Sequence, residues 1–376
     1  MLVLFRHDEK AQIIIHTANM IPFDWENMTQ AVWQSPLLPL ATANSLSTAE
    51  PGPIGSGSKF KTDFLNYLRA YDSKRTNDPT RNGICIPLIE QLSKYDFHEI
   101  RGALVGSAPG RTDVNIDTNS QTLWGWAGLR NVLKSVPAPG PEPDIVVQIS
   151  SIATLGVNDS WLNKTLFEVL RASKTSKATK AKFHIIFPTA DEIRRSLNGY
   201  ASGCAIHTRI QSPPQVKQLQ YLQPMLCHWA GDGPQHKTIH TKIYDAGRKR
   251  AAPHIKTYVR FSDKTQSSID WMLVTSANLS KQAWGEATKP DGTSRICSYE
   301  LGVLVWPELF GEKAAMVPTF KSDTPSITAE QPDDLVVGAR MPYDLPLVPY
   351  AEEDEPWCAS KSYEEFDWKG MDYKLA

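Results

Sequence analysis

The sequence has few cysteines, almost no net charge and no long apolar run. Its five cysteines are odd in number and scattered, and they include no Cys-x-x-Cys pair, which excludes the usual zinc and dithiol motifs. We therefore expect reduced, structural thiols in an intracellular protein. No run of about 18 uncharged apolar residues is present that could cross a bilayer, so we predict a soluble protein without a membrane partner. A net charge of -1 excludes a wholly basic coat for nucleic acid.

A length of 376 residues exceeds the size at which a single core usually stops growing, so two lobes are expected. Apolar and β-branched runs predict strands, and apolar residues at helical spacing predict helices between them. The predicted strands are 1–5, 11–16, 102–106, 144–150 and 182–188, and the predicted helices are 59–71, 87–97, 162–173 and 190–197. This alternation favours an α/β layered fold, with long loops at 42–58 and beyond about residue 321.

A basic segment lies between Lys242 and Arg260, where six basic residues accompany one acid, Asp245. Such a segment could meet phosphate groups, or it could be a solvated loop, and the sequence leaves both interpretations open.

An internal repeat carries the first functional signal. The segment from His16 to Trp25 resembles the segment from Thr275 to Trp284: in both, Ala-Asn closes an apolar strand and a tryptophan lies six residues beyond the asparagine. Upstream of the second copy stands His254-Ile-Lys256. In a strand, residues i and i+2 face the same side, so we expect the histidine and the lysine to point into one site.

If the next strand pairs with this segment, Asn278 arrives beside His254 and Lys256. An imidazole that moves a proton, together with a cation and an amide that hold phosphoryl oxygens, suits phosphodiester chemistry. A second His-x-Lys, His240-Thr-Lys242, lies in a region without a strand pattern, and we therefore favour His254.

Seven sequence blocks resemble the tyrosyl-DNA phosphodiesterase family, in family order and with wording nearest to fungal members. They are Ile15-His-Thr-Ala-Asn-Met-Ile-Pro-Phe-Asp-Trp25, Gly106-Ser-Ala-Pro-Gly-Arg111, Gln148-Ile-Ser-Ser-Ile-Ala-Thr-Leu-Gly156, Pro253-His-Ile-Lys-Thr-Tyr258, Val274-Thr-Ser-Ala-Asn-Leu-Ser-Lys-Gln-Ala-Trp-Gly285, Ser298-Tyr-Glu-Leu-Gly-Val303 and Tyr343-Asp-Leu-Pro346. Like that family, the chain lacks the aspartate that other phospholipase D-type enzymes place after each His-x-Lys.

This resemblance implies a phospholipase D-like fold of two similar α/β/α sandwich lobes related by a pseudo-twofold axis. We assign residues 1–100 to the first lobe and 101–376 to the second. The implied reaction is metal-independent and cofactor-free hydrolysis of the bond between a DNA 3′ phosphate and a topoisomerase tyrosine, or another 3′ adduct, through a phosphohistidine. The implied partners are single-stranded or nicked DNA with blocked 3′ ends and a topoisomerase-derived peptide. The implied location is the nucleus.

The resemblance also assigns roles to single residues. His254 becomes the proton donor and acceptor, while Lys256, Asn278 and Asn19 become ligands of phosphoryl oxygens. Gln30 and Glu300 become the residues that orient the imidazoles, although a structural pair of Glu300 with Arg295 is an equal reading of the sequence alone. The positions matched to DNA-backbone contacts are Ser151, Ile152, Ala153, Thr154 and Ser280. Trp357 is either a stacking residue at the cleft or an aromatic plug under the tail.

The first lobe of this family supplies a nucleophilic histidine in its own His-x-Lys. By the spacing from His254 to Asn278, that motif is expected about two dozen residues before Asn19, at or before residue 1. Neither His7 nor His16 matches it. We therefore predict that the nucleophile is missing from this chain because of an incomplete gene model, and that turnover is lost or severely impaired. The alternatives are a non-catalytic protein that binds DNA ends and, less favoured, a phospholipase D-type lipid enzyme.

Overall fold

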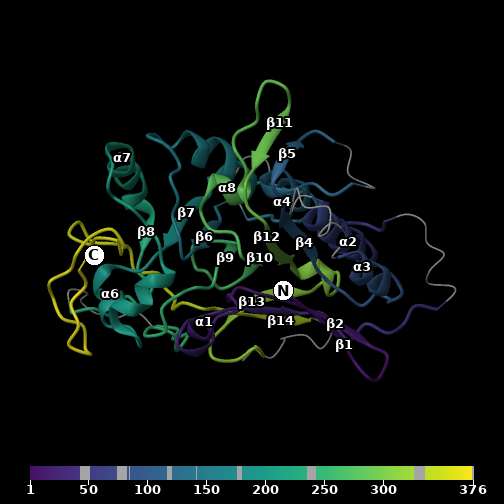
Figure 1. The fold of residues 1–376 in the computed structure, drawn as a ribbon, viewed down its shortest axis with the longest axis horizontal. Helices are drawn as coiled ribbons and strands as arrows, with labels where there is room; N and C mark the ends of the chain where they lie inside the picture. The colour runs from purple at the N-terminus through teal and green to yellow at the C-terminus, as the bar shows by residue number, and fades with distance from the viewer. Residues whose placement is uncertain are drawn as a thin grey trace.

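The computed structural model describes residues 1–42, 51–73, 83, 85–116, 121–140, 142–175, 180–234, 243–325 and 335–374. Its centre is a seven-stranded mixed sheet in the order β4-β12-β10-β9-β6-β7-β8 (Figure 1). The strands are β4 (Ala103–Ser107), β6 (Asp144–Gln148), β7 (Lys182–Ile186), β8 (Leu226–Cys227), β9 (Thr257–Phe261), β10 (Ile269–Thr275) and β12 (Glu300–Val305). Pairing is antiparallel from β4 to β6 and parallel from β6 to β8.

Both faces of this sheet are buried, because successive strand residues enter different cores. Val105 and Val147 pack beneath α4 (Gly125–Leu133) and α5 (Phe167–Leu170). Their neighbours Leu104 and Val146 face the opposite side and belong to two other clusters. Continuous burial on both faces explains why these strands read as uninterrupted apolar runs.

The first hundred residues cover part of this opposite face, over β4 and β12. A three-stranded antiparallel sheet is formed by β1 (Leu2–Phe5), β2 (Ala11–His16) and β3 (Val32–Gln34), so the predicted hairpin is confirmed. Two of the predicted helices also form, as α2 (Gly57–Ser73) and α3 (Ile86–Ser93). These elements share a core with Leu104, Leu301 and Val303 of the central sheet. The mixed α/β prediction is correct, and the two parts of the chain contribute sheets of unequal size.

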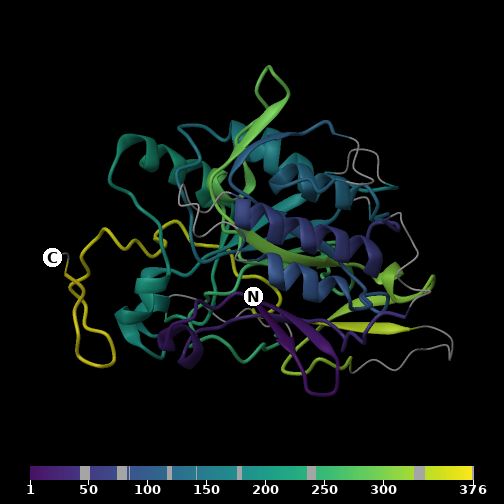
Figure 2. The ribbon, with the colours of Figure 1, turned by 45° about the vertical axis from the view of Figure 1, so that its right-hand side comes forward.

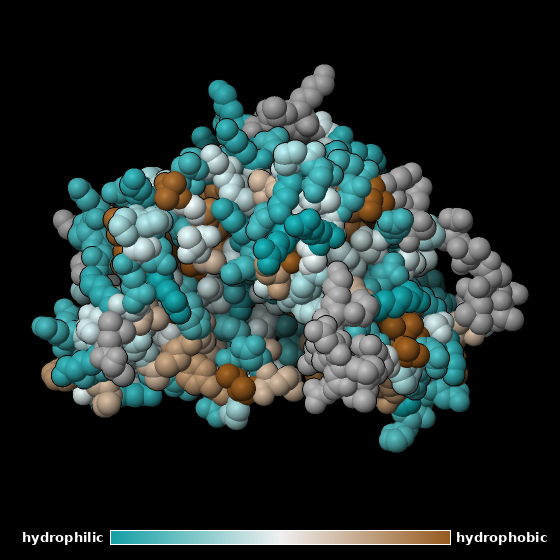
Figure 3. Space-filling view, turned by 45° about the horizontal axis from the view of Figure 1, so that its top comes forward, coloured by the Kyte–Doolittle hydropathy of each residue, from teal (hydrophilic) through white to brown (hydrophobic). Residues whose placement is uncertain are grey.

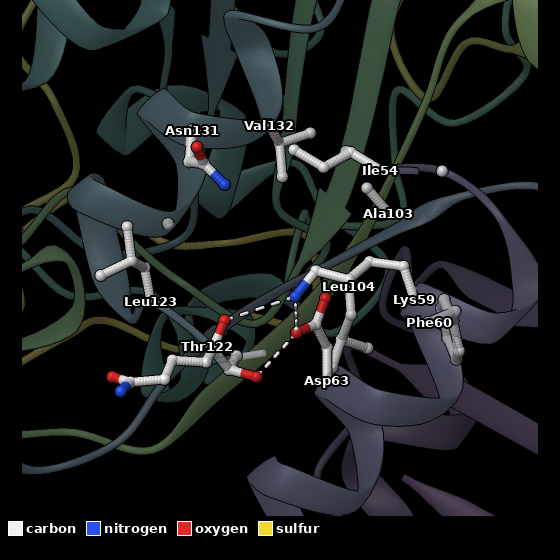
Figure 4. Close-up of a pocket in the computed structure, with 13 residues that line it drawn as sticks. Ile54, Lys59, Phe60, Asp63, Ala103, Leu104, Thr122, Leu123, Asn131 and Val132 are labelled. Atoms are coloured by element: carbon white, nitrogen blue, oxygen red, sulfur yellow. Dashed lines mark hydrogen bonds and ion pairs between the residues drawn. The ribbon is translucent and has the colours of Figure 1, made fainter. Parts of the chain in front are cut away.

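A buried ion pair ties α2 to the segment that precedes α4 (Figure 4). Lys59 Nζ lies 2.9 Å from Asp63 Oδ1 and donates to the Gln121 carbonyl at 3.3 Å. The Thr122 hydroxyl donates to the same carboxylate oxygen at 2.6 Å. Lys59 and Asp63 are both buried, and desolvation raises the pKa of Asp63. The pair therefore holds α2 against the segment that precedes α4.

The remaining elements are short. They are α1 (Pro22–Glu26), α6 (Ala190–Arg194), α7 (Pro213–Leu222), α8 (Lys281–Trp284), the π-helical turn η3 (Leu162–Leu166), the 3-10 turns η4 (Gly199–Ala205), η5 (Gln223–Met225) and η6 (Pro307–Leu309), and the strand pairs β5 (Gly110–Asp113) with β11 (Thr293–Ile296) and β13 (Ala315–Thr319) with β14 (Val336–Arg340). β13 and β14 pair in parallel. They pack on the face of the central sheet that carries Val146 and Met272.

The C-terminal segment beyond β14 runs without regular helix or strand to lie beside α6, as Figures 1 and 2 both show. The long loops predicted after residue 321 are therefore interrupted in the described part by β14 alone. Space-filling shows a mainly hydrophilic face on which hydrophobic residues form small separate groups (Figure 3). None of the described helices combines the length and hydropathy of a membrane span.

Candidate functional site

His254 and Lys256 lie immediately before β9 rather than within a strand. The segment is held by its main chain: the amides of His254 and Ile255 both donate to the Thr29 carbonyl, at 3.0 and 2.8 Å. The prediction that strand alternation alone aims both side chains into one site is therefore wrong in its mechanism. The next strand, β10, does pair with β9 as expected, and Asn278 follows it by three residues.

Two residues from the first hundred of the chain contact the Nδ1 atom of the His254 imidazole. Asp24 Oδ2 lies 3.2 Å from Nδ1, and the Gln30 side-chain amide lies at 3.2–3.3 Å. Asp24 is buried within α1, and its carboxylate also accepts a hydrogen bond from the main-chain amide of Asn19 at 2.6 Å. A carboxylate at Nδ1 favours the tautomer with the proton on that nitrogen, which leaves Nε2 unprotonated and able to act as a base.

Burial has the largest effect on the pKa values of His254, Lys256 and Glu300. Burial and then the Lys256 charge lower the pKa of His254, which is about 4 although Asp24 opposes both effects. Desolvation likewise lowers the pKa of Lys256 to about 7 and raises that of Glu300 to about 7. An anionic phosphodiester beside His254 and Lys256 would favour their cationic forms. Strongly shifted groups gathered around one site are typical of a catalytic centre.

Asn278 has a fixed amide orientation. Its Oδ1 accepts three hydrogen bonds, from the Ser150 amide at 3.0 Å, the Ser150 hydroxyl at 3.2 Å and the Ser151 amide at 2.9 Å. Because all three partners are donors, the oxygen must face them, and the Nδ2 group is left to donate elsewhere. Asn278 thus anchors the loop after β6 through one atom and offers a donor through the other.

A cavity of about 390 Å³ joins these parts. Its lining combines the two asparagines of the repeat with His254, and it draws on segments far apart in the chain. The lining residues are Asn19, Ile21, Phe23, Asp24, Ser150, Ser151, Cys204, Ala205, His207, His254 and Asn278. Within the described ranges, no group of three or more His, Cys, Asp or Glu side chains is arranged to hold a metal ion. The chemistry available here is proton transfer by His254 beside amide and hydroxyl donors.

Comparison with known proteins decides the family. A family model described as tyrosyl-DNA phosphodiesterase matches residues 1–351. The chain belongs to the tyrosyl-DNA phosphodiesterase family. Its members are phosphodiesterases, so the family and the enzyme class predicted from the sequence are confirmed.

Individual relatives agree. The chain is 31% identical to a probable tyrosyl-DNA phosphodiesterase of Schizosaccharomyces pombe, over 98% of this chain and 75% of that protein. It is 29% identical to tyrosyl-DNA phosphodiesterase 1 of Arabidopsis thaliana, over 96% of this chain but only 58% of that protein. A crystal structure of the yeast tyrosyl-DNA phosphodiesterase superposes with a TM-score of 0.65 at 22% identity, over 96% of this chain and 76% of that chain. The structural likeness shows the fold.

Three residues predicted for the tyrosyl-DNA phosphodiesterase site lie behind the cavity rather than on its surface. Gln30 contacts His254, as the family resemblance implied. Lys256 is buried, and its Nζ donates to the His254 carbonyl. Glu300 accepts a hydrogen bond from the Ser276 hydroxyl at 2.6 Å. Among the described residues, no ion pair joins Glu300 to Arg295.

Of the positions predicted to contact the DNA backbone, one lines the cavity and the others do not. Ser151 lines the cavity, whereas Ile152 is buried and its amide donates to the His207 carbonyl at 2.9 Å. The Ala153 carbonyl accepts the Gln218 amide at 2.8 Å. Thr154 is exposed just beyond this loop. The Ser280 hydroxyl accepts the Ala283 amide at 3.0 Å and so caps α8. A DNA contact at these positions stays a prediction.

Trp357 does not lie on the cavity. It is fully buried, and its indole nitrogen donates to the carbonyls of Gly203 and Ile206 at 3.3 and 3.0 Å. Its ring stacks on Tyr200 and Tyr363. The stacking role predicted for this residue is therefore wrong for the described conformation, and the alternative of an aromatic plug is correct.

The basic segment is also corrected. Arg260 is fully buried and pairs with Asp270 at 2.9 Å, so it cannot meet phosphates. Arg250 pairs with Asp232 and Lys249 with Asp344. The competing motif His240-Thr-Lys242 lies outside the described residues.

Sequence reasoning missed Asp24 and His207. Asp24 stands in the repeat where the second copy has Ala283, and this difference within an otherwise similar pair was the available signal. His207 lies in no repeat and near no other motif, so only the fold reveals that it reaches the cavity.

Proposed function

We propose that this chain is a DNA-repair phosphodiesterase that acts on the bond between a DNA 3′ phosphate and a tyrosine. The observation that carries the proposal is the pairing of a buried Asp24–His254 unit with the oriented Asn278 amide at one cavity. Asn278 Nδ2 would donate to a non-bridging oxygen. His254, protonated in the presence of the phosphodiester, would give its Nε2 proton to the leaving phenolate and then accept a proton from water.

The nucleophile is a separate part of the proposal. Family members are expected to form a phosphohistidine on a His-x-Lys of the first half. The described residues bring one such motif, that of His254, to the site, and we propose that turnover requires a second one. Support comes from the repeat: Asn19 and Trp25 match Asn278 and Trp284, whereas neither His7 nor His16 stands in a His-x-Lys.

Hydrolysis of a 3′-phosphotyrosyl oligonucleotide tests this proposal. The 376-residue chain is compared with a chain extended by the upstream coding sequence, and each is compared with its His254→Ala variant. We expect release of tyrosine by the extended chain alone, and its loss in the variant. Release by the 376-residue chain would refute the missing nucleophile. No release by an extended chain that does contain an upstream His-x-Lys would refute the function.

The non-catalytic alternative has one observation in its favour: the described lining includes Asn19, Asn278 and His254, but His254 is its one histidine from a His-x-Lys. If the upstream DNA encodes a stop codon or an unrelated sequence, the chain would bind blocked 3′ ends without cutting them. We place either activity in the nucleus, and a fluorescent fusion that stays in the cytoplasm would contradict that location.

A further inference from the structure

The lining of the cavity combines two kinds of residue. Several carry polar groups that suit a phosphoryl group or orient the groups that bind it, and these are Asn19, Asp24, Ser150, Ser151, His254 and Asn278. The others carry no carboxylate, ammonium or guanidinium group, and these are Ile21, Phe23, Cys204, Ala205 and His207. A phosphate ester with an uncharged, flat substituent fits such a lining, because both parts of the molecule find residues of matching polarity.

His207 has a fixed main-chain position in the lining of the cavity. Its amide donates to the Ser150 carbonyl at 2.9 Å, and its own carbonyl accepts the Ile152 amide at 2.9 Å. Both chain neighbours, Ile206 and Thr208, are buried, while His207 itself is exposed. The backbone is therefore locked to the loop that Asn278 anchors, and the imidazole is free to meet a ligand.

The C-terminal segment supports this arrangement from behind. The Trp357 indole donates to the carbonyls of Gly203 and Ile206, and the Cys358 thiol lies 3.6 Å from the Thr208 carbonyl. The stretch from Gly203 to Thr208 is thus held on one side by the tail and on the other by the loop after β6. A side chain supported in this way needs little ordering when it binds a ligand.

The charge state of His207 indicates what it contacts. Partial desolvation in the cavity, followed by the charges of Arg209 and Lys256, lowers the pKa of this imidazole, so the ring is neutral near pH 7. A neutral imidazole forms no ion pair with phosphate, but it presents an aromatic face and one N–H donor. Among the parts of a 3′-phosphotyrosyl end, the phenolic ring matches these properties.

We propose that His207 is a specificity-determining residue that contacts the aromatic leaving group of a 3′ adduct. This inference rests on the proposed function and adds to it the residue that separates aromatic adducts from bare 3′ phosphates. An aromatic contact of this kind changes affinity by about 2- to 10-fold.

The test measures binding, so it does not depend on turnover. Fluorescence anisotropy compares the 376-residue protein and its His207→Ala, His207→Phe and His98→Ala variants on three oligonucleotides of one sequence, ending in 3′-phosphotyrosine, 3′-phosphate or 3′-hydroxyl. His98 is an exposed histidine on the distant loop after α3 and serves as the matched control. Thermal melting confirms that each variant is folded.

We expect His207→Ala to weaken binding of the phosphotyrosyl end by about 2- to 10-fold, to leave the phosphate end unchanged, and to be rescued by phenylalanine. Equal losses on the phosphate and phosphotyrosyl ends, or no loss on either, would overturn the inference. If the parent protein shows no preference for either phosphorylated end over the hydroxyl end, the proposed function itself fails.

Discussion

The His254 imidazole lies between opposing charges, the Asp24 carboxylate and the Lys256 ammonium. Since Lys256 lowers and Asp24 raises the imidazole pKa, Lys256→Met should raise it above its value of about 4 and Asp24→Asn should lower it. Histidine ring signals followed by NMR from pH 3 to 8 measure this directly, with His98 as the internal reference. An unchanged pKa in both variants would mean that neither charge acts on the ring.

The raised pKa of Glu300 predicts that the stability of the protein depends on pH. Its folded-state pKa of about 7 lies above the ordinary value of 4.5, so the folded state retains a proton that the unfolded state has lost. Stability is therefore intact below about pH 4.5 and falls as pH rises through 7. Glu300→Gln avoids this loss. Urea unfolding should show the variant gaining about 3 kcal/mol relative to the parent between pH 4.5 and 8; a constant difference would contradict the assignment.

Gly203 tests the aromatic plug. A Cβ added here would lie 2.1 Å from the Trp357 ring, whereas one added at Gly311 would meet nothing within 4 Å. Gly203→Ala should therefore destabilise the protein by about 1–3 kcal/mol through overpacking. Gly311→Ala should cause little change. Denaturant unfolding monitored by tryptophan fluorescence compares the two, and equal stability of both variants would show that Trp357 does not pack against this turn.

At the scale of elements, the joint between α2 and the chain before α4 depends on the Lys59–Asp63 pair (Figure 4). Lys59→Met leaves a buried carboxylate without its cation and should cost about 3–5 kcal/mol in unfolding free energy. The double variant Lys59→Met/Asp63→Leu removes both charges and should recover most of this loss. If the double variant is no more stable than Lys59→Met, the unpaired charge is not the cause.

Most elements could be predicted because their signals are local. The strands of the central sheet are apolar on both faces, and β2 alternates between buried and half-buried residues, so periodicity finds them. The parallel pairing of β13 with β14 depends on contacts between distant segments, which no local pattern encodes. The segment of His254 and Lys256 looked like a strand because it is apolar and alternating, but its hydrogen bonds go to Thr29 instead.

At the scale of the whole molecule, the site joins segments separated by more than two hundred residues. The motifs identified His254, Asn278 and Asn19 because the repeat and the family wording mark them. Asp24 differed from Ala283 in the repeat, but its contact with His254 depends on tertiary structure, and His207 carried no local signal. Trp357 was misjudged for a related reason: an aromatic residue in an irregular tail gives no sign of whether it faces solvent or a neighbouring turn.

The central claim is that the cavity around His254 and Asn278 holds the phosphoryl group of a DNA 3′ end. Asn278→Asp tests it most directly, because the new carboxylate can still accept the hydrogen bonds of Ser150 and Ser151 while the donor toward the cavity becomes an anion. Anisotropy should show the parent protein preferring a 3′-phosphotyrosyl over a 3′-hydroxyl oligonucleotide by roughly tenfold or more, and the folded variant losing that preference. Equal preference in the parent and the variant would contradict the account.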